Sequence, residues 1–148
     1  MRNAINAFFK APAYAVVGVS ANRRKFGNAA YRAMKEHGLR VFPVNPKLET
    51  VEGDACFRSL RDLPEDVTSV VTVVPPSATE LVVKECTERG ITAVWMQPGS
   101  QSPAAIASAE RARMAVVHGE CIMMFLEPVQ SFHAFHRFVK KLFGSYPR

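Results

Sequence analysis

Short apolar runs recur along the chain, each bounded by glycine, proline or polar residues. The runs are rich in valine, and within most of them both alternating faces are apolar. A strand of this kind is typical of a parallel sheet that is covered on both sides. The pattern predicts buried strands at residues 14–19, 39–45, 67–76, 91–97 and 115–119.

The segments between these runs carry the signals of helix starts and ends. Ser77 followed by Glu80 has the spacing of a capping box, and Ser102 stands directly before Pro103, a residue favoured in a first turn. Residues 53–64 predict only a brief strand and a helical turn. The expected helices occupy residues 2–9, 27–37, 78–89, 102–114 and, as an amphipathic helix after the last strand, 129–143.

This alternation of strands and helices predicts one α/β domain over residues 1–148. Right-handed crossovers make its sheet doubly wound and mainly parallel, Rossmann-like, with helices on both faces. Ligands of such sheets bind at the carboxyl ends of the strands, near the point where the strand order reverses. The loops that follow the strands should therefore share one rim.

Composition fits this class, because 148 residues that are 48% hydrophobic can bury a core in one domain. The net charge of +6 is unevenly distributed. Residues 1–50 carry nine Lys or Arg against two acids, residues 51–127 six against eleven, and residues 128–148 four against none. No RNA-binding aromatic signature, zinc spacing or recognition-helix pattern accompanies the basic residues, so nucleic acid is not the expected partner.

Three cysteines, an odd number, match neither a disulfide framework nor a metal cluster. Asn6, Lys10 and Pro12 interrupt the apolar run that a secretion signal would need. No apolar run approaches the length of a membrane span. The sequence therefore predicts a cytoplasmic protein without a membrane span.

The loop after the first strand, residues 18–25, is here called the glycine loop. It departs from the dinucleotide pattern G-x-G-x-x-G, because Ser20 and Arg23 stand where the second and third glycines belong. A strand that enters a helix through a glycine turn aims free N–H groups and the positive end of the helix dipole at a ligand. We expect an anion with several charges, held by Gly18, Val19, Ser20, Arg23, Arg24, Lys25 and Gly27.

The other rim loops extend this candidate site. Asn45, Pro46 and Lys47 follow the second strand, where NAD-binding domains usually carry an acid for the ribose. A lysine there favours a ribose phosphate, as in NADP or coenzyme A, although it is equally compatible with a solvated turn. Further along, Pro75 offers a rigid apolar shelf, and Met96, Gln97 and Pro98 form either a ligand-facing wall or a structural turn.

Four landmarks in order make the chain similar to a known family: "VVGVS", "VFPVNPK", "AVWMQPG" and "GECIMM". The sequence resembles the small CoA-binding domain proteins, which are similar in turn to the N-terminal CoA-binding domain of succinyl-CoA synthetase alpha chains. The resemblance runs from about Tyr14 to Met124. Lys25 stands at the place of a family arginine, and Phe26 and Gly27 replace a proline and a serine.

The resemblance implies coenzyme A as the cofactor. The glycine loop would hold the CoA phosphates, residues 45–47 would flank the nucleotide, and Pro75 with residues 96–98 would line its opposite side. The synthetases use a phosphorylated histidine in a second domain, and His118 does not match that setting.

Neither a catalytic residue nor a metal site is predicted. His133 and His136, three residues apart, have no evident third ligand. Cys121 is either a small core residue or, if it faces the rim, a thiol able to form a disulfide with CoA.

The predicted function is therefore binding of CoA or an acyl-CoA without catalysis. Two alternatives stay open: a small NADP-linked oxidoreductase or redox sensor, and a subunit of a multi-chain acyl-CoA ligase. The helix at 129–143 is expected to pack on the domain itself, a second copy or another protein.

Overall fold

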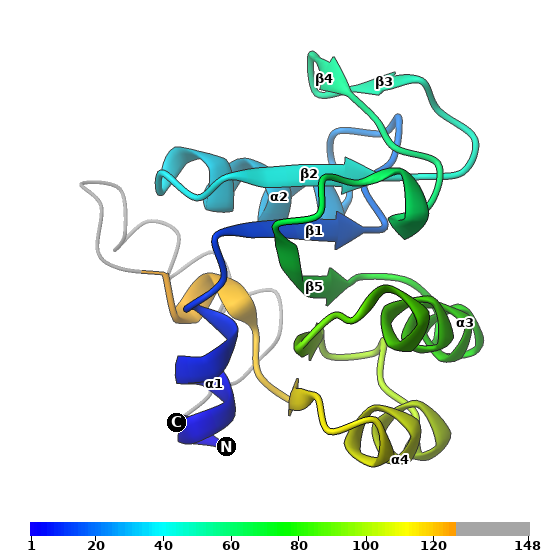
Figure 1. Cartoon of the computed structure of the whole chain (residues 1–148). Coiled ribbons are helices and arrows are strands. Elements are labelled where there is room, and N and C mark those ends of the chain that lie inside the picture. The colour runs from blue at the N-terminus through cyan, green and yellow to red at the C-terminus, as the bar shows by residue number, and fades with distance from the viewer. Residues whose placement is uncertain (127–148) are drawn as a thin grey trace.

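The computed structural model describes residues 1–126, so the helix expected at 129–143 lies outside the described residues. A five-stranded parallel sheet forms the centre, in the order β2-β1-β5-β6-β7 (Figure 1). The predicted doubly wound, Rossmann-like sheet is confirmed. Its strands are β1 (Ala13–Val17), β2 (Val41–Val44), β5 (Val67–Thr72), β6 (Ala93–Met96) and β7 (Ala115–His118).

The strand order reverses beside β1. The chain moves from β1 outward to β2, then returns to the opposite side of β1 for β5 and continues outward to β7. The carboxyl ends of β1 and β5 therefore border the switch point, which is where sheets of this topology place their ligands. The loop that follows β1 is the glycine loop.

Helices cover both faces of the sheet. On one face lie α1 (Arg2–Phe8) and α2 (Phe26–Glu36), and on the other lie α3 (Pro76–Arg89) and α4 (Pro103–Arg111). The alternation of side chains along β1 follows this division: Tyr14 and Val16 pack in the core with α1 and α2, whereas Ala15 and Val17 pack with α3 and α4. None of the helices among residues 1–126 combines the length and apolar character needed to cross a bilayer.

The predicted capping box at Ser77 is wrong. Helix α3 already begins at Pro76, with Pro75 as its N-cap and no side-chain cap. A proline at the first helical position has a fixed backbone angle suited to the helix and no N–H that needs an acceptor, so the start moves ahead of the serine. Glu80 instead accepts a hydrogen bond from Ser102 Oγ at 2.9 Å. Strand β5 accordingly ends at Thr72, short of the predicted residue 76.

The cap predicted at the start of α4 is confirmed. Ser102 is the N-cap, and its side-chain oxygen accepts a hydrogen bond from Ala105 N at 3.0 Å. Pro103 occupies the first turn, as the sequence indicates. Two short 3₁₀ turns complete the helical elements, η1 (Leu60–Asp62) and η2 (Ile122–Met124).

The brief strand and the helical turn predicted over residues 53–64 are present, but the sequence did not predict that the strand belongs to a small hairpin between β2 and β5. Strands β3 (Thr50–Val51) and β4 (Asp54–Ala55) are joined by Glu52 and Gly53, whose φ angles are 54° and 78°. Two positive φ angles in a two-residue loop identify a turn of type I′. After the hairpin, Phe57 pairs with the outer edge of β2, donating from its N–H to Pro43 O and accepting from Asn45 N.

Candidate functional site

The glycine loop is built against the end of β5. Gly18 has a φ of +116°, and a Cβ at this position would lie 2.2 Å from Val73 O. The Gly18 N–H donates to Val44 O at 3.3 Å, and Val73 N donates to Val17 O at 2.8 Å. Only glycine fits this crossing of backbones, so the chain turns directly at the switch point of the sheet.

Gly27 brings the start of α2 onto the same loop. A Cβ at Gly27 would lie 2.3 Å from Gly18 O, a backbone atom that cannot move aside. Helix α2 has Lys25 as its N-cap and no side-chain cap. Among residues 1–126, the N–H groups of Ala21, Arg23 and Gly27 have no protein acceptor. The loop therefore offers backbone donors and the positive end of a helix dipole.

Polar side chains within the loop fix its shape. Ser20 Oγ accepts from Asn22 N at 2.9 Å, and Asn22 Oδ1 accepts from Arg24 N at 3.0 Å. Ser20, which carries a hydroxyl, is among the residues that the sequence predicts to hold the ligand. In the structure this hydroxyl already holds the turn of its own loop.

Asn28, which the sequence analysis missed, clamps the peptide of Ser20 from the first turn of α2. The Asn28 side chain is fully buried. Its Oδ1 accepts from Ser20 N at 2.9 Å, and its Nδ2 donates both to Ser20 O at 2.7 Å and to Glu52 Oε2 at 2.8 Å. The amide thus joins the glycine loop to the tip of the hairpin.

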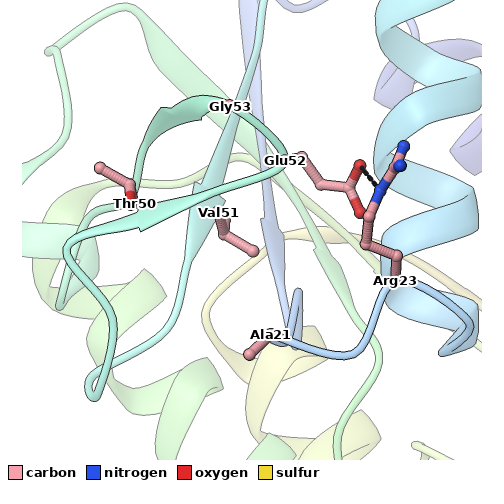
Figure 2. A pocket seen from close by; sticks show the side chains of 6 residues that line it. All are labelled: Ala21, Arg23, Thr50, Val51, Glu52 and Gly53. Atoms are coloured by element: carbon pink, nitrogen blue, oxygen red, sulfur yellow. Dashed lines mark hydrogen bonds and ion pairs between the residues drawn. The ribbon is translucent and has the colours of Figure 1, made fainter.

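Glu52 gathers basic side chains at that tip. Its side chain is only 3% exposed, and it pairs with Arg23 Nε at 3.1 Å (Figure 2). It also pairs with an Arg32 guanidinium nitrogen at 2.8 Å. Burial by itself would raise the pKa of the Glu52 carboxyl, but hydrogen bonds from Asn28 and Arg23 and the charge of Arg32 outweigh burial and hold this pKa below its ordinary value. Glu52 with Asn28, Arg23 and Arg32 is called the Glu52 cluster below.

The lowered pKa makes part of the stability depend on pH. The carboxylate contributes stability above the ordinary Glu pKa of 4.5, and this contribution disappears as the pH falls through the lower folded pKa. We therefore expect the free energy of unfolding of the wild type to fall more steeply than that of Glu52→Gln between about pH 5 and pH 3. Urea unfolding of both proteins at several pH values measures the difference, and parallel curves would contradict it.

An open cleft of about 540 Å³ lies beside the cluster. It is bordered on one side by Ala21 and Arg23 of the glycine loop and on the other by residues 50–53 of the hairpin (Figure 2). The side chain of Arg23 extends from the glycine loop toward the hairpin, where it pairs with Glu52 (Figure 2). The hairpin therefore forms one wall of the candidate site.

The loop after β2 is tied to the glycine loop. Asn45 Nδ2 donates to Val19 O at 2.9 Å, and Asn45 Oδ1 accepts from Lys47 N at 2.8 Å. The side chain of Lys47 is exposed. In the described part of the chain, the side chains of Arg24, Lys25 and Lys47 form no hydrogen bond or ion pair, in contrast to Arg23. Two neighbouring loops thus present cations without a protein partner.

The sequence of this region matches a known protein family. The sequence profile of the CoA binding domain family matches residues 12–127, which include the glycine loop, the hairpin and every strand of the sheet. The chain belongs to the CoA binding domain family.

Curated relatives of this CoA binding domain are larger proteins. The alpha subunit of acetate–CoA ligase (ADP-forming) II from Pyrococcus furiosus is 32% identical over 91 residues, which are 61% of this chain and 20% of that protein. Acetate–CoA ligase (ADP-forming) from Methanocaldococcus jannaschii is 31% identical over 77 residues, 52% of this chain and 11% of that protein. The chain therefore spans a fifth or less of the length of these relatives.

Solved structures include relatives of similar size. A conserved hypothetical protein from Pyrococcus furiosus is 40% identical, with a TM-score of 0.73, and the alignment covers 76% of this chain and 97% of that one. A hypothetical protein from Pyrococcus horikoshii is 30% identical, with a TM-score of 0.77 and coverage of 82% and 86%.

In this CoA binding domain, some of the ligand-lining residues predicted after β5 and β6 are accessible to solvent and others are buried. Pro75 is exposed and Pro98 is half-buried, so both reach the rim. Met96 and Gln97 are buried. The amide of Gln97 is occupied inside the protein, since Oε1 accepts from Ile122 N at 2.8 Å and Nε2 donates to Cys121 Sγ at 3.6 Å. These two side chains support the wall behind the rim.

Cys121 lies inside the fold. Its side chain is 2% exposed, and burial raises the pKa of its thiol despite hydrogen bonds that act in the opposite direction. A buried thiol with a raised pKa is a poor nucleophile for disulfide exchange. Of the two alternatives that the sequence left open, the structure favours the core residue. Residues 1–126 also contain no group of three His, Cys, Asp or Glu side chains that could hold a metal.

Proposed function

We propose that this chain binds coenzyme A, free or as an acyl-CoA, at the carboxyl ends of β1, β2 and β5. The observation that carries the proposal is the pair of neighbouring loops whose cations, Lys25 on the glycine loop and Lys47 after β2, have exposed side chains without a partner among residues 1–126. CoA has a diphosphate and a 3′-phosphate, so it needs cations and N–H donors at two places. Membership in the CoA binding domain family supports the same ligand.

In this proposal the diphosphate lies over the glycine loop. The N–H groups of Ala21, Arg23 and Gly27 and the side chains of Arg24 and Lys25 surround it with donors. Lys47 pairs with the 3′-phosphate, and Gly18 with the buried Val19 forms the backbone turn beneath the ligand. Asn45 and Pro46 flank the nucleotide, and Pro75 and Pro98 line its opposite side, with Met96 and Gln97 behind them.

A second candidate function is that of a subunit in a multi-chain acyl-CoA ligase. It is favoured by the similarity to a protein named as the alpha subunit of an ADP-forming acetate–CoA ligase, of which this chain spans 20%. The isolated chain would then bind CoA and perform no catalysis alone. Formation of acetyl-CoA from ATP, acetate and CoA by the purified chain would contradict this assignment.

The test of CoA binding is a calorimetric titration with CoA, dephospho-CoA, NAD and NADP. We expect CoA to bind about ten-fold or more tightly than dephospho-CoA, because a charge-assisted hydrogen bond to the 3′-phosphate contributes about 1.5–3 kcal/mol. NAD should bind weakly, since no acid follows β2 to accept its ribose hydroxyls. Lys25→Ala and Lys47→Ala should each weaken CoA binding and reduce its salt dependence.

Lys84→Ala is the matched control, because Lys84 is an exposed lysine in the middle of α3, away from the rim. It should leave CoA affinity unchanged. Equal affinities for CoA and dephospho-CoA would refute the role of Lys47. Tighter binding of NADP than of CoA would favour an NADP-linked oxidoreductase or redox sensor.

A further inference from the structure

We propose that Glu52 is a positioning residue for the glycine loop, and that Arg23 leaves Glu52 to pair with a bound phosphate. The inference rests on the proposed binding of CoA at this loop. It assigns a role to Glu52 at the hairpin tip, which is 29 positions from Arg23 of the glycine loop and 24 positions from Asn28 of α2 in the sequence.

Glu52 has a backbone conformation that is unfavourable for glutamate. Its φ of 54° belongs to the left-handed region, which glycine, asparagine and aspartate tolerate far better than glutamate. A two-residue turn of type I′ prefers Asn-Gly, whereas this chain has Glu-Gly. The turn alone therefore disfavours glutamate. A residue that breaks a local preference is explained by what its side chain contacts.

Those contacts hold the glycine loop through Asn28. An amide has one oxygen and one nitrogen, and its orientation follows its partners. Because Glu52 Oε2 can only accept, it fixes Asn28 Nδ2 on its own side, and Asn28 Oδ1 must then face Ser20 N. Both the N–H and the C=O of the Ser20 peptide are thereby held. The Ser20 peptide requires the same orientation of the amide, and Glu52 reinforces it by accepting from Asn28 Nδ2 on the hairpin side.

Arg32 adds a second connection from the same face of α2. Asn28 and Arg32 are four residues apart, so their side chains are neighbours on the helix surface. One Arg32 guanidinium nitrogen donates to Glu52 Oε2 at 2.8 Å and to Arg23 O at 3.1 Å. The same cation therefore ties the hairpin to the backbone of the glycine loop.

Arg23 is the exchangeable member of the cluster. Its side chain is 71% exposed, and it makes one contact with Glu52, at 3.1 Å. An ion pair with such an exposed partner is weak, because water and salt screen it. If Arg23 leaves, Glu52 keeps Arg32 and Asn28, and the buried carboxylate retains one opposite charge. A phosphate with its larger charge can then attract Arg23 without disrupting the clamp.

The variant Glu52→Asn distinguishes the backbone preference of the turn from the side-chain contacts that Glu52 makes with Asn28 and Arg32. Asparagine suits the left-handed position and gives the favoured Asn-Gly turn, but its side chain is too short to reach Asn28 and Arg32 together. We expect Glu52→Asn to keep the hairpin and to weaken CoA binding at least ten-fold in calorimetric titration. Glu52→Gln retains an acceptor for Asn28 and should bind CoA with intermediate affinity.

Glu49→Asn is the matched control, because Glu49 is 87% exposed just ahead of the hairpin and pairs only loosely with Arg58, at 3.7 Å. Its CoA affinity should equal that of the wild type. Exchange of Arg23 is followed by NMR: the Nε–H signal of Arg23 should shift on saturation with CoA, while the backbone signal of Glu52 stays near its free position.

The outcomes distinguish this inference from the proposed function. If the wild type binds CoA and both Glu52 variants bind it equally well, the positioning role is refuted and the proposed function stands. An Arg23 signal that does not move when CoA binds refutes the exchange. If the wild type binds no CoA, the proposed function itself fails.

Discussion

Gly27→Ala is expected to lower the free energy of unfolding by about 3 kcal/mol and to abolish CoA binding. The added Cβ would lie 2.3 Å from Gly18 O and 2.9 Å from Gly18 C, both backbone atoms. The start of α2 would have to move away from the glycine loop. Helix propensity acts in the opposite direction, because alanine is favoured over glycine in a helix by about 1 kcal/mol. A loss of stability in Gly27→Ala would therefore show that the close contact with Gly18 O outweighs the higher helix propensity of alanine.

Urea unfolding and CoA titration of the variant check this expectation. Gly38→Ala is the control: Gly38 has a φ of +91°, but an added Cβ would meet nothing within 4 Å. It should cost only the strain of its backbone conformation, about 1–2 kcal/mol, and leave CoA affinity intact. A Gly27→Ala protein as stable as the wild type would show that α2 does not need this contact.

Asn28→Asp should be nearly as damaging, although it changes the side chain by one atom. The change replaces the Nδ2 donor by an oxygen that faces Glu52 Oε2 and Ser20 O, both of them acceptors. Two carboxylates would share a buried site, and Ser20 O would lose its partner. Breaking such a buried set costs about 3 kcal/mol at neutral pH.

The pH dependence identifies the cause. Two carboxyl groups this close raise the pKa of one of them, so a proton relieves the repulsion. The stability deficit of Asn28→Asp should be complete near pH 7.5 and shrink as the pH falls toward about 5. Asn22→Asp is the control, since Asn22 is exposed and its Oδ1 accepts from Arg24 N, a contact that aspartate reproduces. Equal deficits for Asn28→Asp at both pH values would contradict the assignment.

The apolar pattern predicted the sheet correctly because its central strands β1, β5 and β6 are buried on both faces over nearly their whole length. Ser102 was predicted correctly as a cap, whereas Ser77 was not, because two prolines ahead of it moved the helix start. The hairpin was missed for a different reason. Strands of two residues have no period, and the acids that hold the hairpin act on residues of α2 that are distant in sequence.

The candidate site was predicted only as far as local signals extend. Gly18 and the basic residues after it can be recognised from a strand, a glycine and a helix in succession. Asn28 and Glu52 cannot, because their importance lies in contacts between segments. The same limit explains Gln97, which looks like a rim amide in sequence but turns inward to Ile122 N. The assignment of the other rim residues to CoA stays a prediction until binding is measured.

The hairpin also affects the outer border of the sheet. β2 is an edge strand, and an edge strand with free N–H and C=O groups is a template on which another chain can add a strand and aggregate. Pro43 removes one donor from this edge, and Phe57, just after the hairpin, occupies the neighbouring groups. Asp54 accepts from Tyr31 Oη and Lys35 Nζ, both at 2.5 Å, so it fastens the second strand of the hairpin to α2 as Glu52 fastens the tip. The two acids on either side of Gly53 therefore keep closed an edge at which intermolecular β-pairing could start.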